Sequence, residues 1–118
     1  MNIEDVHKKR IFGLIGLCAK AGNIVCGIDA TIQEIERKKV KLVIVAEDSS
    51  ERTKKNIKLI CQNKKIKIIE IGRMEELSMT IGKTNKAIIG IKSKSITDGI
   101  EKIIKENIGG DLLWKYMN

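Results

Sequence analysis

Residues 41–48 read Lys41-Leu42-Val43-Ile44-Val45-Ala46-Glu47-Asp48, an apolar run that ends in two acids. Successive side chains of a strand point to opposite faces, so a run that is apolar at nearly every position predicts a strand buried on both sides. Such a strand lies in the middle of a sheet that is covered by helices on both faces. Two serines and then a basic, helix-like segment at 51–64 follow, which places positive charge near the carboxyl end of this strand. The expected partner is therefore an anion.

The rest of the chain alternates between helix and strand patterns. We expect helices where apolar residues recur every three or four positions, and strands where short apolar runs lie between turn residues. The expected helices cover 4–21, 28–39, 49–64, 74–81 and a last segment through Ile100 and Ile108 that ends near Gly109-Gly110. The expected strands cover 23–26, 41–47, 67–71 and 86–91. This alternation predicts an α/β fold in which a four-stranded sheet lies between two helical layers.

Length and charge limit the possible functions. A chain of 118 residues fits one domain, which we expect at 1–110 with a tail at 111–118. The net charge of +8 and the sequence pI near 9.5 favour a polyanionic partner. No apolar run approaches the roughly 20 residues of a membrane span, and the first residues do not resemble a targeting segment. We therefore expect a cytoplasmic monomer with no membrane partner.

The three cysteines do not form a metal-binding or disulfide pattern. Cys18, Cys26 and Cys61 lack CxxC spacing and sit in apolar runs, which is typical of reduced thiols in a core. His7 is the only histidine, so a zinc site would lack ligands. We expect neither a metal nor another cofactor.

Two motifs could carry chemistry. Glu47-Asp48 at the end of a strand could bind Mg²⁺ or accept a phosphoryl group, but a turn and a helix cap explain the pair better. Asp48 and Glu51 have capping-box spacing, with Ser49 and Ser50 as rival caps. The sequence at 82–84, Gly-Lys-Thr, resembles the end of a phosphate-binding loop, yet the glycine required five residues earlier is absent. No set of nucleophile, base and orienting group is present, so we expect a protein that is not an enzyme.

Basic residues concentrate in one segment. Between Arg52 and Lys67 there are seven Lys or Arg and no Asp or Glu. The helical pattern predicts that Lys54, Lys55 and Lys58 point away from the buried face, either as a solvated surface or as a surface that binds phosphate. Aromatic residues make up 3% of the chain, which argues against base stacking and leaves recognition of nucleic-acid shape and phosphate.

The order of these parts resembles a known family. The matching segments within residues 8–105 are Gly27, Glu36-Arg37, 41–48, 59–61, 69–72, 75–77 and 81–83. Together they resemble the ribosomal protein L7Ae family, and within it the bacterial YlxQ-like branch of ribosome-associated RNA-binding proteins. The resemblance implies a three-layer α/β/α sandwich with a mixed sheet. It also implies binding to kink-turn RNA, a helix that bends sharply at a bulge followed by tandem sheared G·A pairs.

The resemblance also implies which residues contact RNA. In the family an Asn-Glu-x-x-Lys pattern after the first strand reads the G·A step, and the aligned positions here are Asp29, Ala30 and Gln33. A second loop, before the last strand, faces the bulged nucleotides, and here it is polar and basic. The expected RNA-binding residues are Gly27, Ile28, Asp29, Gln33, Lys83, Thr84, Asn85 and Lys86, with Lys20 and Arg37 as nearby phosphate contacts.

The alternative hypothesis is a protein-interaction module in a ribosomal or transcription–translation complex that binds RNA only nonspecifically. An RNA-recruiting domain related to those of ribose methyltransferases, and a phosphoacceptor or metal enzyme at Glu47 and Asp48, are further alternatives.

Overall fold

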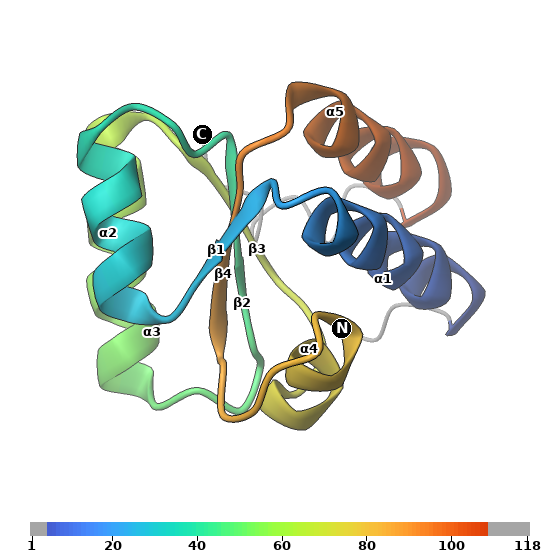
Figure 1. The fold of residues 1–118 in the computed structure, drawn as a ribbon, viewed down its shortest axis with the longest axis horizontal. Helices are drawn as coiled ribbons and strands as arrows, with labels where there is room; N and C mark the ends of the chain where they lie inside the picture. Colours follow the sequence, from blue (N-terminus) through green and yellow to red (C-terminus); the bar gives the residue numbers. More distant parts are fainter. Residues whose placement is uncertain (1–4, 109–118) are drawn as a thin grey trace.

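The centre of the molecule is a mixed sheet of four strands. The computed structural model describes residues 5–108, and the sheet contains β1 (Ile24–Cys26), β2 (Leu42–Val45), β3 (Lys67–Glu70) and β4 (Ile88–Ile91). Their order in space is β1-β4-β2-β3 (Figure 1). β2 runs parallel to β3, whereas β4 runs antiparallel to both β1 and β2. The four-stranded mixed sheet expected from the sequence is confirmed.

The strand β2 is central in the sheet, as its apolar sequence predicted. All four residues of β2 are buried, and β2 has a hydrogen-bonded neighbour on each side. Leu42 and Ile44 face one apolar cluster, while Val43 and Val45 face the other. Both faces of this strand are therefore core, which explains why every position in it is apolar.

Helices cover the sheet on both faces. α2 (Ile28–Glu36) and α3 (Glu51–Lys64) lie on one side, and α1 (Asp5–Lys20), α4 (Met74–Thr80) and α5 (Lys94–Ile103) lie on the other (Figure 1). Each layer buries its isoleucine-rich face against one side of the sheet. This arrangement confirms the three-layer α/β/α sandwich. No helix of residues 5–108 has the length and apolar character needed to cross a membrane.

The last helix differs from the expectation. α5 does not continue as a regular α-helix but passes into a π-helical segment at Ile104–Ile108. Ser93 begins α5, because its hydroxyl accepts a hydrogen bond from the Ile96 N–H at 3.2 Å. The expected end at Gly109-Gly110, the tail at 111–118 and residues 1–4 lie outside the described residues, so the domain boundary stays an expectation.

The turn after β2 is built differently from the capping box expected there. Ser50 is the N-cap of α3, and its hydroxyl accepts a hydrogen bond from the Thr53 N–H at 3.1 Å. Asp48 instead accepts from the Met74 N–H at 2.8 Å, at the start of α4, and lies 3.5 Å from the Arg73 guanidinium. Capping therefore explains Asp48, as expected, but the helix that it caps is α4 and not α3.

The three cysteines are free thiols, as predicted. Cys18 and Cys61 are buried and Cys26 is half-buried. Burial raises the pKa of the Cys61 thiol to about 12 and also raises the pKa of Cys18. These two groups stay protonated and behave as small apolar side chains.

A glycine in β4 allows the close approach of its neighbours, and its replacement tests the packing. A Cβ at Gly90 would lie 2.7 Å from Val25 Cγ1 and 3.2 Å from both Thr31 Cγ2 and Val40 Cγ2. Because β-branched side chains are stiff, Gly90→Ala should lower the free energy of unfolding by about 1–3 kcal/mol in urea titration. Gly13→Ala is the control, since a Cβ there meets nothing within 4 Å on an exposed helix face. It should raise stability by roughly 0.5–1 kcal/mol, and equal effects of the two changes would contradict this account of β4.

Candidate nucleic-acid interface

Two segments far apart in the sequence meet at one end of the sheet, where β1 finishes and β4 begins. Because β1 and β4 are antiparallel, with Cys26 opposite Ile89, the end of β1 lies beside the start of β4. The Gly27 N–H donates to the Ile88 carbonyl at 2.9 Å, and a Cβ on Gly27 would lie 3.9 Å from Lys86 Nζ. In Figure 1 this end is at the bottom of the view, where α2 starts and the chain enters β4.

We call this region the loop-pair surface. Its residues are Gly27, Ile28, Asp29, Gln33, Lys83, Thr84, Asn85 and Lys86. The structure thus brings together the two segments that the sequence resemblance singled out.

Gly27 opens α2 in a conformation that suits glycine. Its φ is +91°, and the residue caps α2 without any side-chain hydrogen bond. The carbonyl of Gly27 accepts from the Thr31 N–H at 3.1 Å. The first N–H groups of a helix have no acceptor within the helix, so in the absence of a side-chain cap they can bind an anion.

The first two turns of α2 expose a polar face. Asp29, Ala30 and Gln33 are all exposed, while Ile28 is half-buried. Residues three and four apart are neighbours on a helix surface, so Gln33 lies close to both Asp29 and Ala30. This face can donate and accept hydrogen bonds at Gln33 and accept them at Asp29, but it carries no cation.

A buried serine holds the second loop in place. The Ser78 hydroxyl accepts from the Lys86 N–H at 2.8 Å and donates to the Lys86 carbonyl at 3.2 Å, while the Ser78 carbonyl accepts from the Lys83 N–H at 2.9 Å. Asn85 adopts a φ of +55°, which Asn tolerates better than most residues. Ser78 was not predicted from the sequence, where its only signal was a small polar residue next to the inward-facing Leu77 of an amphipathic helix.

The two lysines of this loop keep their charges available. Lys83 is exposed and Lys86 is half-buried, and neither makes an ion pair with any residue between 5 and 108. The nearby carboxylate of Asp48 is directed to the start of α4. The loop-pair surface is therefore cationic on its β4 side, whereas its α2 side is polar and carries the negative charge of Asp29.

Lys20 and Arg37 are not brought to this surface. Arg37 follows the last residue of α2, so the nine-residue helix, about 13 Å long, separates it from Gly27. It pairs with Glu34 at 3.3 Å. Lys20 ends α1 before the chain enters β1 at Ile24, which pairs with Ile91 at the other end of β4. The structure therefore places both residues near the opposite ends of the strands, away from the loop-pair surface.

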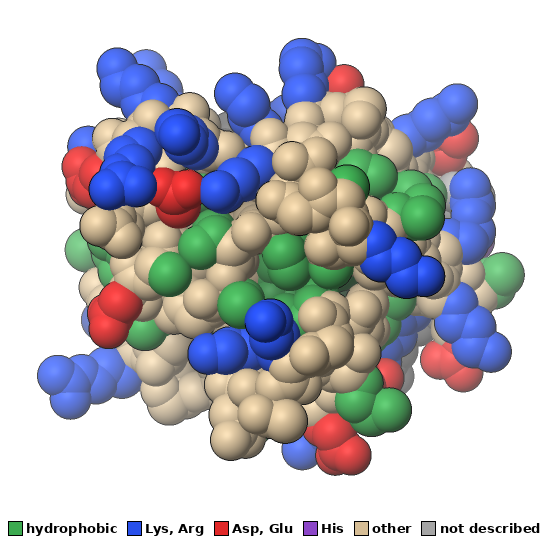
Figure 2. All heavy atoms as spheres, viewed as in Figure 1, with side chains coloured by type: hydrophobic (Ala, Val, Ile, Leu, Met, Phe, Trp, Pro, Cys, Tyr) green, Lys and Arg blue, Asp and Glu red, His purple; other side chains and the backbone are tan. Residues whose placement is uncertain are grey.

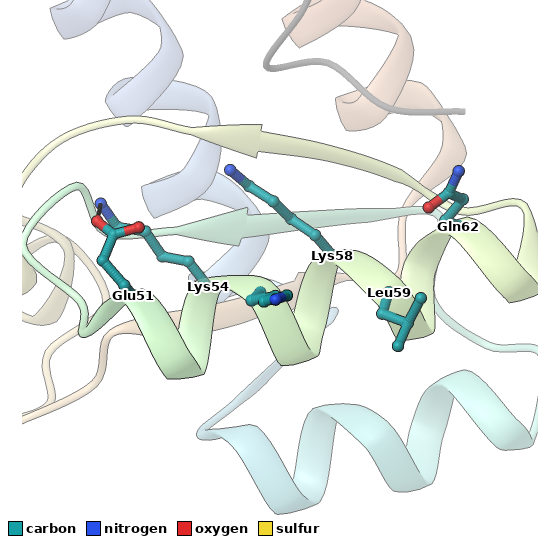
Figure 3. A pocket seen from close by; sticks show the side chains of 6 residues that line it. Glu51, Lys54, Lys58, Leu59 and Gln62 are labelled. Atoms are coloured by element: carbon teal, nitrogen blue, oxygen red, sulfur yellow. Dashed lines mark ion pairs between the residues drawn. The ribbon is translucent and has the colours of Figure 1, made fainter.

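The expectation of an outward basic stripe on α3 is wrong for two of its three lysines. Lys54 is only 9% exposed and lies 3.1 Å from the Glu70 carboxylate, and Lys58 lies 3.3 Å from the same group. Figure 3 shows both side chains reaching from α3 toward the neighbouring strand. Long lysine stems can lie along apolar surface and carry their charge to a distant partner, which helical periodicity alone does not reveal. Only Lys55 is exposed as predicted.

Glu70 is held in its charged form by these lysines. Burial alone would raise the pKa of Glu70, but the hydrogen bonds and charges of Lys54 and Lys58 outweigh it, so the pKa lies below its ordinary value.

The two lysines line an open hollow of ≈ 450 Å³ along α3 together with Leu59 and Gln62 (Figure 3). Within residues 5–108 no group of three metal-ligating side chains comes together.

The chain belongs to the ribosomal protein L7Ae/L30e/S12e/Gadd45 family, whose model matches residues 9–104. The α/β/α layers and the juxtaposed loops described above are thus features of a member of this family.

Particular relatives narrow the class further. The chain is 35% identical over 108 residues to a protein of Enterococcus faecium called RNA-binding protein YlxQ, covering 92% of this chain and all of that protein. It is 27% identical to the Bacillus subtilis (strain 168) protein of the same name, over 79% of this chain and 93% of that one. A solved structure from Bacillus halodurans C, described as a protein of unknown function, superposes with a TM-score of 0.78 at 27% identity. That match covers 82% of this chain and 98% of the other.

The Glu70 cluster predicts a pH-dependent contribution to stability. Glu70→Gln removes the closer and more buried of the two carboxylates that pair with Lys54, and should lower the free energy of unfolding by about 2 kcal/mol at pH 7. Because the folded-state pKa of Glu70 is below its unfolded value near 4.5, the wild-type advantage is present above that pH and is lost as pH falls through the folded pKa. Urea titrations at several pH values measure it, with the exposed Glu47→Gln as control. A difference that stays constant down to pH 3 would contradict the ion-pair account.

The Ser78 hydroxyl is expected to fix the second loop. Ser78→Ala would leave both backbone groups of Lys86 without this partner and should cost roughly 1–2 kcal/mol. Amide hydrogen exchange at Lys86 should become faster. The amide of Ile96, which is capped by Ser93 in another part of the fold, serves as the internal control and should keep its rate. Unchanged exchange at Lys86 would show that the loop does not depend on Ser78.

Proposed function

We propose that this protein is a non-enzymatic, ribosome-associated RNA-binding protein that recognises kink-turn or similarly bent RNA through the loop-pair surface. Family membership and the names of the relatives support RNA as the ligand. The observation that carries the proposal is the contact between the start of α2 and the loop before β4, seen at Gly27 and Lys86. One RNA can reach both segments only because the sheet places them side by side.

The charges of the surface suit a bent RNA. Bending crowds phosphates together, and a cationic surface that binds the crowded form more tightly shifts the population toward it. Lys83 and Lys86 supply this charge, and the N–H groups at the start of α2 supply further donors to an anion. RNA folding and protein binding are then coupled equilibria.

The α2 side of the surface contributes less charge than the family pattern does. Asp29 can accept hydrogen bonds from a guanine edge but repels phosphate, and Gln33 retains a donor without a positive charge. Ala30 offers neither a donor nor an acceptor side chain. We therefore assign most of the phosphate attraction to Lys83 and Lys86 and only hydrogen bonding to Asp29 and Gln33.

The setting of this activity follows from the same features. The family includes ribosomal proteins, and the thiols Cys18 and Cys61 are buried and reduced, which suits a reducing compartment. We propose a cytoplasmic protein that acts as a monomer on ribosomal or similarly structured RNA, without a cofactor.

Comparison of two RNAs tests the proposal. At physiological salt the protein should bind a kink-turn RNA at least about tenfold more tightly than a straight duplex of equal length, as measured by fluorescence anisotropy. Lys83→Gln with Lys86→Gln should remove most of this preference and reduce the slope of log K against log salt by roughly 1.4–1.8. Lys9→Gln with Lys102→Gln, two exposed lysines on α1 and α5, is the control with equal loss of charge. Equal affinity of the wild-type protein for both RNAs would favour a protein-interaction module with nonspecific RNA binding.

A further inference from the structure

A second group of exposed lysines lies at the ends of the strands opposite to the loop-pair surface. They occupy the turns that follow α2 and α3, and we call them the basic rim: Lys38, Lys39, Lys41 and Lys65. The Lys41 N–H donates to the Ile91 carbonyl at 2.7 Å, which fixes this turn at the end of β4. In Figure 2 the blue side chains gather at the upper left, over the ends of α2 and α3.

The two turns lie side by side. A small hollow of ≈ 230 Å³ is lined by Lys38 and Val40 from the first turn and by Lys64 and Ile66 from the second. An ion pair of 3.2 Å between Lys64 and Glu36 joins the ends of the two helices. The two turns that carry the basic rim are therefore neighbours.

The charges of the basic rim are not neutralised within the fold. None of its four lysines makes an ion pair with any residue in the described range 5–108. The carboxylates nearby are already engaged, because Glu34 binds Lys92 at 2.7 Å and Arg37 at 3.3 Å, and Glu36 binds Lys64. Exposed lysines with no acidic partner are an electrostatic surface for a polyanion.

The backbone ends α2 and α3 in the same way at the basic rim. Lys38 and Lys65 have φ values of +62° and +57°, a left-handed conformation that Gly or Asn adopts with less strain. A positive charge near a helix carboxyl end favours the helix dipole, but Arg37 and Lys64 already provide it one residue earlier. Both residues end a helix in the ordinary left-handed way, because the Lys38 N–H donates to the Ile35 carbonyl and the Lys65 N–H donates to the Gln62 carbonyl. The helix ends therefore explain the φ values, and lysine at these positions adds charge to the basic rim.

We propose that the basic rim is a second RNA-binding surface, which holds the phosphate backbone of a duplex segment while the loop-pair surface holds bent RNA. The identity of the first segment rests on the proposed function. Lysine binds phosphate as a point charge, and the base edges of an RNA duplex lie in a deep, narrow groove, so we expect the four lysines to bind duplex RNA through its phosphates and without regard to sequence. The two surfaces lie at opposite ends of α2, so one protein can join two RNA segments.

A ternary-complex titration tests the bridge. The protein is first saturated with unlabelled kink-turn RNA, and a fluorescent straight duplex is then added while anisotropy is measured. The wild-type protein should bind the duplex without releasing the first RNA. Lys38→Asn/Lys39→Gln/Lys65→Asn should weaken duplex binding about tenfold or more and reduce its salt slope by roughly 2–3, with kink-turn binding changed less than about twofold.

The variant is designed so that loss of binding cannot be confused with loss of folding. Asn is better suited than Lys to the left-handed positions. The melting temperature of the variant should therefore equal or exceed that of the wild-type protein. The control, Lys9→Gln/Arg10→Gln/Lys102→Gln, removes the same charge from exposed positions on α1 and α5 and should retain duplex binding.

Three results would overturn the proposal. The first is that the complex saturated with kink-turn RNA does not bind the duplex. The second is that the rim variant and its control lose duplex affinity equally, and the third is that the protein binds polyglutamate more tightly than the duplex. If the kink-turn RNA does not bind but duplex binding still depends on the basic rim, the proposed function fails while the rim remains an RNA-binding surface.

Discussion

The insertion of β4 between β1 and β2 determines how the loops at the two ends of the sheet are arranged. The chain leaves β1 at Gly27 and returns to the same end at Lys86, so antiparallel pairing of β1 with β4 brings the two loops together. Gly90 permits this pairing because side chains of β1 and α2 occupy the space that a Cβ would need. Burial of β2 on both faces then fixes the sheet between its helical layers. The loop-pair surface is thus a consequence of strand order and not of local sequence.

Charge is divided between surfaces that are paired internally and surfaces that are not. Lys54 and Lys58 hold Glu70 at the end of β3, so these two of the seven basic residues between Arg52 and Lys67 are paired internally, whereas Lys65 of the same segment belongs to the basic rim. Lys83 and Lys86 at one end of the sheet, and the basic rim at the other, keep their charges for an external anion. Ion pairing within the fold therefore decides which lysines keep an unpaired charge, and their number in the sequence does not.

The sequence was sufficient for the fold because its strongest signals are local: a continuous apolar run for the central strand, and apolar residues every three or four positions for the helices. The apolar run at 41–48 predicted the central strand, and the order of parts predicted the family that the comparison confirmed. Contacts between residues distant in the chain were not predictable in the same way. Asp48 caps a helix 26 residues away. Ser78 holds the loop before β4 through a hydrogen bond from the Lys86 N–H, a contact that only the folded chain creates. The positions of Lys20 and Arg37 also required strand order, since their charge is visible in the sequence and their end of the sheet is not.

The loop-pair surface is proposed to bind bent RNA more tightly than extended RNA. Energy transfer between dyes on the two ends of a kink-turn RNA measures this directly at low magnesium, where the free RNA is extended. Addition of the protein should raise the transfer efficiency to a plateau, with a midpoint that matches the binding affinity. Saturated binding with no change in transfer would show that the protein does not select the bent form and would contradict the account.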